Sequence, residues 1–368
     1  MDIPVKRNAK VFGVNEANFG PLALEIFRFQ YANNPVYKNY TDALGISPAS
    51  VKTIGQIPFL PVRFFKTHAI HATLFEPQAI FESSGTSGSN NSRHLVKDVS
   101  LYEESFTKGF EFFYGPVKDY CIIGLLPSYS ERQNSSLVYM VEKMIKLSEH
   151  HQSGFYLNEY EKLFVVLSEL ERKQQRTLLI GVTFALLDMA EKFSLQLNYT
   201  IIMETGGMKG RREEMIRPQV HSILKKSFQV PVIHSEYGMT ELLSQAYSKG
   251  DGIFYCPPWM KVMLRDEEDP LMVQSGVQLL TPDSRLSTPD SRLPAPDSRL
   301  PAPDSQLPTP DSQLPTQTGP INIIDLANIY SCSFIATDDV GRLYTDGRFE
   351  VFGRMDGSDL RGCSLMVV

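Results

Sequence analysis

Residues 176–193 read RTLLIGVTFALLDMAEKF, and residues 198–210 read NYTIIMETGGMKG. The first stretch is an apolar run of strand length followed by an amphipathic segment with helical spacing. The second is another apolar run, which leads into a glycine-rich loop. A turn at Gly181 is expected between the first strand and the helix. Strand, helix and strand in this order predict a right-handed crossover between two parallel strands.

The same alternation extends to both sides of this unit. Strands that run into polar loops are expected in residues 78–84, 119–130 and 230–241. Residues 211–228 have a helical pattern, in which Pro218 predicts a kink or a break. The chain is therefore predicted to be an α/β protein with a largely parallel sheet. In such a sheet the loops that follow the strands share one edge, where ligands bind; the loops expected there are 83–89, 127–132, 205–210 and 235–241.

A repeated segment interrupts this pattern. Residues 281–315 contain five tandem copies of a seven-residue unit of the type TPDSRLP, within an insertion placed at 281–318. The period of seven does not predict a coiled coil, because a proline in every unit removes a helical N–H and clashes with the preceding turn. One leucine per unit cannot supply a core, so an extended, mostly disordered loop is expected. A tolerated surface insertion accounts for it better than a ligand of a PxxP-binding domain does.

The residues after the insertion have a different pattern. Short apolar segments alternate with turn signals, which predicts a small antiparallel β subdomain. The segments are INIID (321–325), CSFIATDD (332–339), RLYTDG (342–347) and FEVFGR (349–354).

Composition excludes several classes of protein. The 368 residues are 42% hydrophobic and 21% charged, with a net charge of -6, which is ordinary for a soluble globular chain of one or two domains. No global positive charge draws it to nucleic acid. The longest apolar runs are too short to span a bilayer and the N-terminus has no secretory signal, so a cytoplasmic protein is expected. The four scattered cysteines predict neither a zinc site nor a disulfide framework.

Three motifs contain residues suited to binding a nucleotide. Residues 82–94, ESSGTSGSNNSRH, offer glycines and hydroxyls that can surround a phosphate, although such a stretch is also typical of a plain loop. In 235–241, SEYGMTE, a tyrosine can stack on a base and a glutamate can hold Mg²⁺. In 337–341, TDDVG, and 353–356, GRMD, a carboxylate and an arginine can bind sugar hydroxyls and phosphate. Taken by itself, SEYGMTE is better explained as a turn that enters a helix at Thr240, and TDDVG and GRMD are also typical of two hairpin turns.

In this order along the chain, SSGTSG, EYGMTE, TDD and GRMD resemble the adenylate-forming superfamily of acyl-CoA synthetases and acyl-protein synthetases. The acyl-protein synthetase group of bacterial luminescence systems is most similar, because IPFLPVRFFKTH (57–68), TGGMKG (205–210) and the short C-terminus also fit it. The resemblance covers roughly residues 50–275 and 319–363, and its specificity lies in the ordered set. It implies the large N-terminal domain of that fold over residues 1–353, a hinge-like tail over 354–368, and no C-terminal lid domain.

The resemblance also implies a reaction. ATP would convert a carboxylic acid, a fatty acid in the luminescence group, to an acyl-adenylate, and a thiol would then take the acyl group. Thr240 would touch the α-phosphate and Glu241 would hold Mg²⁺, while Tyr237 would stack on adenine and Asp339 would bind the ribose. The other residues that the resemblance places at the nucleotide are Ser83, Ser84, Gly85, Thr86, Ser87, Gly88, Gly206, Gly207 and Arg354.

Two features set this chain apart from the superfamily pattern. The phosphate loop usually ends in a lysine, whereas residues 89–92 here are SNNS, so Lys66, Arg93 or Lys209 would have to supply the positive charge. The luminescence group carries its acyl group on a cysteine near the C-terminus, and Cys363 follows Arg361, whose charge favours a thiolate. Cys363 is thus a candidate acyl acceptor, with a small buried apolar side chain as the alternative.

The function expected is that of an AMP-forming acid–thiol ligase with ATP and Mg²⁺ as cofactors. The acyl acceptor is expected to be coenzyme A or a protein thiol, such as that of an acyl reductase or carrier protein. Two alternatives remain. The chain could be a non-catalytic nucleotide- or acyl-binding remnant of the same fold, or it could act through the proline-rich insertion.

Overall fold

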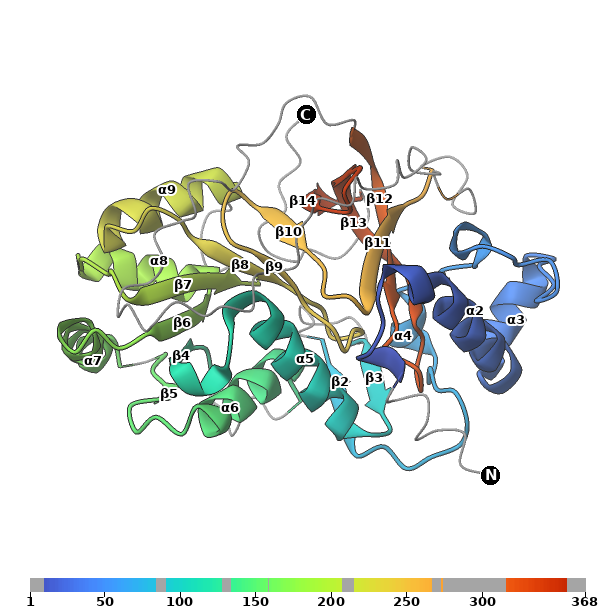
Figure 1. Ribbon diagram of the computed structural model, residues 1–368, viewed down its shortest axis with the longest axis horizontal. Coiled ribbons are helices and arrows are strands. Elements are labelled where there is room, and N and C mark those ends of the chain that lie inside the picture. The colour runs from blue at the N-terminus through green and yellow to red at the C-terminus, as the bar shows by residue number, and fades with distance from the viewer. Residues whose placement is uncertain are drawn as a thin grey trace.

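The computed structural model describes residues 10–83, 91–127, 134–157, 159–206, 215–266, 273 and 316–355. Its centre is a twelve-stranded mixed sheet with the strand order β11-β12-β13-β14-β10-β9-β8-β7-β6-β4-β5, in which β1 pairs with β13. Helices α2 and α3 lie at one end of the molecule and α7, α8 and α9 at the other (Figure 1).

One half of the sheet is parallel, as the alternation of apolar runs and amphipathic segments predicted. Its strands are β4 (Cys121–Leu125), β5 (Gly154–Phe155), β6 (Thr177–Val182), β7 (Thr200–Thr205) and β8 (His234–Tyr237). All five residues of β4 are buried, which explains its unbroken apolar run, because helices cover both faces. The crossover helices are α6 (Ser136–Ser148), α7 (Tyr160–Arg172), α8 (Thr183–Lys192) and α9 (Arg217–Phe228).

Two hydrophobic clusters divide the helices between the two faces of the parallel half. Cys121, Ile123 and Leu125 of β4 pack with buried residues of α7, α8 and α9. Ile122 faces the other way, into the larger cluster, which includes residues of α5 (Val99–Tyr114) and α6. The alternating directions of successive strand residues thus place each β4 side chain in one of two cores.

Two local predictions in this half were wrong. Gly181 lies within β6, where it pairs with Glu204, and α8 begins directly after the strand at Thr183. Pro218 does not kink a helix but lies in the first turn of α9, where its missing N–H costs no hydrogen bond.

The second half of the sheet is antiparallel. Its strands are β9 (Ala246–Ser248), β10 (Ile253–Tyr255), β11 (Met260–Leu264), β12 (Thr316–Asp325), β13 (Phe334–Tyr344) and β14 (Phe349–Arg354). The predicted antiparallel segments are confirmed, but they belong to the same sheet as the parallel strands, because β9 pairs with β8. The boundary expected at residue 318 was too late, since residues 316–318 of β12 already pair with β13.

The strand predicted in residues 78–84 does not join the parallel sheet. Residues Ala79–Glu82 form β2, which pairs antiparallel with β3 (Arg93–Val96) in a separate two-stranded sheet. The loop predicted over 83–89 therefore belongs to a hairpin, because the connection is too short for a crossover between parallel strands.

The remaining elements pack at the N-terminal end. They are α2 (Glu16–Asn33), α3 (Pro35–Ala43), the 3₁₀ turn η1 (Ile54–Gln56), β1 (Leu60–Pro61), α4 (Phe64–Thr67) and the 3₁₀ turn η2 (Val117–Asp119). Gln30 of α2 is fully buried and bonds the β12–β13 loop: its side-chain amide donates to the carbonyls of Asn328 and Ile329. None of the helices in the described part of the chain is long and apolar enough to cross a membrane.

Candidate functional site

Three residues that the sequence singled out meet where β8, β13 and β14 come together. Tyr237 ends β8, and its hydroxyl donates to Asp339 Oδ2 over 2.7 Å. Asp339 of β13 lies opposite Arg354 of β14 in the strand register, with 3.4 Å between Oδ1 and the arginine Nε. Asp339 and Tyr237 are 102 positions apart in the chain, so the fold assembles the group.

A second acidic residue extends this group. Arg354 Nη2 lies 3.1 Å from Asp338 Oδ2, and Arg63 donates to Asp338 Oδ1 over 3.3 Å. Asp338 and Asp339 both lie within β13. The alternative interpretation of TDDVG as a hairpin turn was therefore wrong. Gly341 is required just beyond them, because a Cβ there would lie 2.1 Å from the carbonyl oxygen of Glu350.

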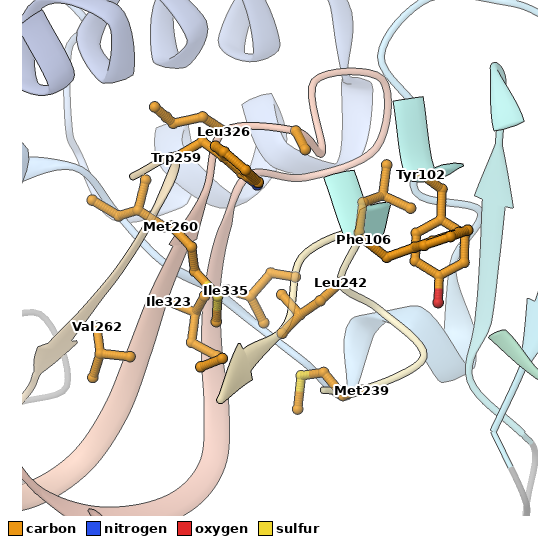
Figure 2. Close-up of a cluster of buried hydrophobic side chains, with 14 of the residues drawn as sticks. Tyr102, Phe106, Met239, Leu242, Trp259, Met260, Val262, Ile323, Leu326 and Ile335 are labelled. Carbon is orange, nitrogen blue, oxygen red and sulfur yellow. The ribbon is translucent and has the colours of Figure 1, made fainter. Parts of the chain in front are cut away.

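Thr240 and Glu241 follow β8 on a segment that is anchored from both sides. Met239 and Leu242 flank the pair and are buried in the larger hydrophobic cluster, to which Ile335 also belongs (Figure 2). Glu241 itself is fully buried. Apolar side chains on both sides therefore fix the path of the backbone through these two residues.

The turn that follows Glu241 is held by a buried carboxylate. Asp325, at the end of β12, accepts hydrogen bonds from the backbone N–H groups of Leu243 and Ser244 and from the Ser244 hydroxyl. Three residues further on, the side-chain amide of Asn328 donates to the Glu241 carbonyl over 2.8 Å. The β12–β13 loop thus determines the shape of the chain around Glu241.

The described ends of the β2–β3 loop are also tied together. Ser83 Oγ accepts from the N–H of Ser92 over 2.9 Å, and the N–H of Ser83 donates back to the Ser92 carbonyl. His94, two residues later on β3, bonds the Thr240 carbonyl through Nδ1 at 2.8 Å. Arg93, a candidate for the missing cation, points elsewhere: its side chain is 58% exposed and lies 3.6 Å from Glu82.

Gly206 ends the described part of the loop after β7. Its φ of 59° is left-handed, a conformation that glycine adopts without strain, and its carbonyl accepts from the Thr183 hydroxyl. Its neighbour Thr205 pairs with Glu236, so Gly206 lies at the same edge of the sheet as Tyr237. The convergence predicted for these two loops is therefore present for Gly206 and Tyr237.

Two glutamates lie on neighbouring strands near Gly206: Glu204 of β7, which is buried, and Glu236 of β8, which is half-buried. Burial raises the pKa of Glu236 to about 7, and the negative charge of Glu204 acts in the same direction. Glu204 behaves oppositely: burial alone would raise its pKa, but the nearby His221 ring, 3.6 Å away, and the charge of Arg217 lower it to about 2. One carboxyl is thus half-protonated near neutral pH while its neighbour is ionised.

Several predicted residues lie outside the part of the chain that the structure describes. They are Ser84, Gly85, Thr86, Ser87, Gly88, Gly207, Lys209, the 281–315 repeats and Cys363. Their roles stay predictions. Of the predicted nucleotide contacts, the described ones are Ser83, Gly206, Tyr237, Thr240, Glu241, Asp339 and Arg354.

Sequence reasoning missed the buried polar residues behind the site. His94, Asp325 and Asn328 are each at most 1% exposed. None of the three was among the residues predicted to contact the nucleotide. Two of them left a signal. In RHLV, His94 shares the inward face with Val96, and Asp325 ends the apolar run INII. Asn328 left no pattern, because its role depends on residues 87 and 234 positions away.

The carboxylates of the site bear on whether a magnesium ion could bind there. No group of three or more His, Cys, Asp or Glu residues that could hold a metal occurs among the described residues. A site for Mg²⁺ with ATP needs only one or two carboxylates, because phosphate oxygens and waters supply the other ligands. The single carboxylate of Glu241 fits that requirement.

No protein-family model and no curated protein sequence matches the chain. Among solved structures it is similar to 2-hydroxyisobutyryl-CoA ligase in the postadenylation state with 2-HIB-AMP, at 12% identity and a TM-score of 0.56, over 94% of this chain and 70% of that one. An open conformation of the ligase with 2-HIB-AMP and CoA gives 11% identity and a TM-score of 0.54, over 92% and 74% of the chains. Such identities show a shared fold, and the predicted fold of the large adenylate-forming N-terminal domain is confirmed.

Proposed function

We propose, on the premise that the chain shares its fold with an acyl-CoA ligase, that it activates a carboxylic acid with ATP and passes the acyl group to a thiol. The observation that carries the proposal is the joining of Tyr237, Asp339 and Arg354 at the carboxyl end of β8. An aromatic ring, a carboxylate and a guanidinium beside the end of a parallel strand provide the chemistry that a nucleoside phosphate requires.

The reaction has two steps. A carboxylate oxygen attacks the α-phosphorus of ATP, the bond to pyrophosphate breaks, and an acyl-adenylate remains. A thiolate then attacks the acyl carbon, and AMP leaves with the electrons of the mixed anhydride bond. Such chemistry depends on positioning and charge neutralisation more than on a protein nucleophile.

Each described residue has a specific task in this proposal. Asp339 accepts from the ribose hydroxyls with the lone pairs that Tyr237 and Arg354 leave available, since a carboxylate has about four acceptor sites. Thr240 donates to the α-phosphate, and Ser83 fixes the start of the phosphate loop. Glu241 would hold Mg²⁺, which when bound neutralises phosphate charge.

The finer assignments follow the motif resemblance. We propose a fatty acid as the substrate, ATP and Mg²⁺ as cofactors, and coenzyme A or a protein thiol as the acceptor. Cys363 is the thiol of this chain proposed to receive the acyl group. Incubation with labelled fatty acid and ATP tests this assignment: the label is expected on the wild type and not on Cys363→Ser, and a label retained by the variant would contradict it.

Acid-dependent ATP–pyrophosphate exchange over a panel of carboxylic acids tests the function. Exchange is expected with at least one acid, and Glu241→Gln is expected to reduce it strongly because the variant removes the charge proposed to hold the metal. Binding of ATP without exchange for any acid would replace the proposal with a non-catalytic nucleotide-binding protein.

A further inference from the structure

His94 is a buried residue with two polar contacts to segments that are distant in sequence. It is 1% exposed, and Nδ1 lies 2.8 Å from the Thr240 carbonyl while Nε2 lies 3.0 Å from Asn328 Oδ1. The side-chain amide nitrogen of Asn328 in turn donates to the Glu241 carbonyl over 2.8 Å. One imidazole and one amide therefore contact the backbone carbonyls of both Thr240 and Glu241.

The direction of these bonds follows from what each atom can do. A carbonyl only accepts, so the NH₂ group of Asn328 must face Glu241 and its oxygen must face His94. Both ring nitrogens of His94 therefore face oxygen atoms that accept. Burial lowers the pKa of His94, although the Thr240 carbonyl, the charge of Glu241 and Asn328 act against this. A neutral ring donates one of the two bonds, and the shorter distance favours Nδ1–H to Thr240.

The imidazole cannot easily move away from this position. The ring of Phe65 packs edge-on against it, with 5.9 Å between the centroids. On the far side, Gln30 fixes the loop that carries Asn328 by donating to two of its carbonyls. Because its neighbours are fixed, the imidazole keeps β3 at a constant distance from the segment after β8.

We propose that His94 is a positioning residue, which holds the Thr240–Glu241 segment against β3 through Nδ1–H. His94 is two residues from Ser92, whose N–H binds Ser83 Oγ. The backbone of Thr240 and Glu241 is thereby held close to the Ser83–Ser92 pair, the described ends of the β2–β3 loop. The inference rests on the proposed function for its catalytic consequence, but the contact itself does not.

Two substitutions separate the two ring nitrogens. An asparagine side chain places its NH₂ group close to the position of Nδ1, whereas glutamine reaches the position of Nε2. His94→Asn therefore keeps a donor to Thr240, whereas His94→Gln loses that donor and places an amide at Asn328 instead. Only His94→Gln loses the hydrogen bond that the neutral ring donates, so the larger loss of thermal stability is expected for His94→Gln. Ser331→Ala is the matched control, because it removes a buried hydrogen bond from the same loop to the Ile70 carbonyl.

Amide hydrogen exchange of peptides that cover residues 238–246 needs no substrate. We expect His94→Gln to exchange about tenfold faster than the wild type there, as expected for one lost buried hydrogen bond, whereas His94→Asn and Ser331→Ala stay within about threefold. Wild-type exchange in His94→Gln, or equal acceleration in His94→Asn, would overturn the proposal.

ATP–pyrophosphate exchange gives the catalytic readout. His94→Gln is expected to lower kcat by about ten- to a hundredfold, with a smaller change in KM for ATP, because misplaced groups penalise the transition state most. His94→Asn is expected to retain most of the activity. If the wild type shows no exchange with any acid, the proposed function fails, and the hydrogen-exchange result still decides whether His94 holds the segment.

Discussion

At the scale of single residues, Asp339 is the best-defined member of the site, since it binds Tyr237 through one oxygen and faces Arg354 with the other. Asp339→Asn keeps the size of the side chain and removes its charge. We expect KM for ATP to rise about ten- to a hundredfold, because hydrogen bonds to a charged group are worth about 1.5–3 kcal/mol. Asp346→Asn is the control, because it removes a carboxylate from the same β13–β14 hairpin, where Asp346 pairs with Arg348. An equal effect of both variants would count against a ribose contact.

Glu236 gives a prediction about pH. Its pKa rises from 4.5 to about 7 on folding, so between these values the folded state binds the extra proton and stability falls as the pH rises. Glu236→Gln removes this dependence and keeps an acceptor for the Thr205 hydroxyl. At pH 8 we expect the variant to be more stable than the wild type by about 2 kcal/mol, with the difference vanishing towards pH 4.5. Urea unfolding at several pH values measures it, with the exposed Glu76→Gln as a control that should show no such trend.

The sequence was informative for residues whose chemistry is visible in a motif. Tyr237, Asp339 and Arg354 were found because they belong to the ordered motifs EYGMTE, TDD and GRMD, which resemble those of the adenylate-forming superfamily. His94 and Asn328 were not: the inward face of His94 in RHLV indicates burial but no partner, and Asn328 left no pattern. Their contacts become visible only when β3, the segment after β8 and the β12–β13 loop are placed together.

At the scale of elements, the ion pair of Glu204 and Arg217 joins β7 to α9, with 3.2 Å between the carboxylate oxygen and Nε. Arg217 also donates to the Val351 carbonyl of β14. Arg217→Met would leave Glu204 as an uncompensated buried charge, so we expect a loss of about 3–5 kcal/mol in unfolding free energy. Lys226→Met, on an exposed position of the same helix, should change it by less than about 0.5 kcal/mol. Partial recovery in the double variant with Glu204→Gln would confirm the cause, and no recovery would contradict it.

Strands and helices were predicted well where the hydrophobic periodicity is strong. The pairing of the strands was predicted poorly, because it depends on which strand lies alongside. The runs that became β4, β6 and β7 are continuous and apolar because both faces are covered. β2 was recognised as a strand, but its partner is β3, a four-residue strand with no comparable signal. The predicted antiparallel strands exist, but their membership of the large sheet depends on the pairing of β8 with β9.

At the scale of the whole molecule, the 281–315 repeats lie between two strands whose pairing is already fixed. β11 and β12 pair from Met260 with Asp325 to Leu264 with Ile321. Deletion of residues 281–315 should leave the melting temperature and ATP–pyrophosphate exchange unchanged, because each halving of a loop alters its closure free energy by only about 0.6 kcal/mol. Deletion of 326–331 from the buried β12–β13 loop should instead prevent folding. A loss of activity in the first variant would assign a role to the insertion.

The buried link from Gln30 to Asn328 also sets an order of events during synthesis. The two residues are 298 positions apart, so α2 leaves the ribosome long before its hydrogen-bonding partners exist. The side-chain amide of Gln30 must remain hydrated, and the Thr240–Glu241 segment must remain without its Asn328 contact, until translation has passed the insertion. A nascent chain paused in the repeats would therefore expose an unfinished site, because the loop that completes it is translated only after the insertion.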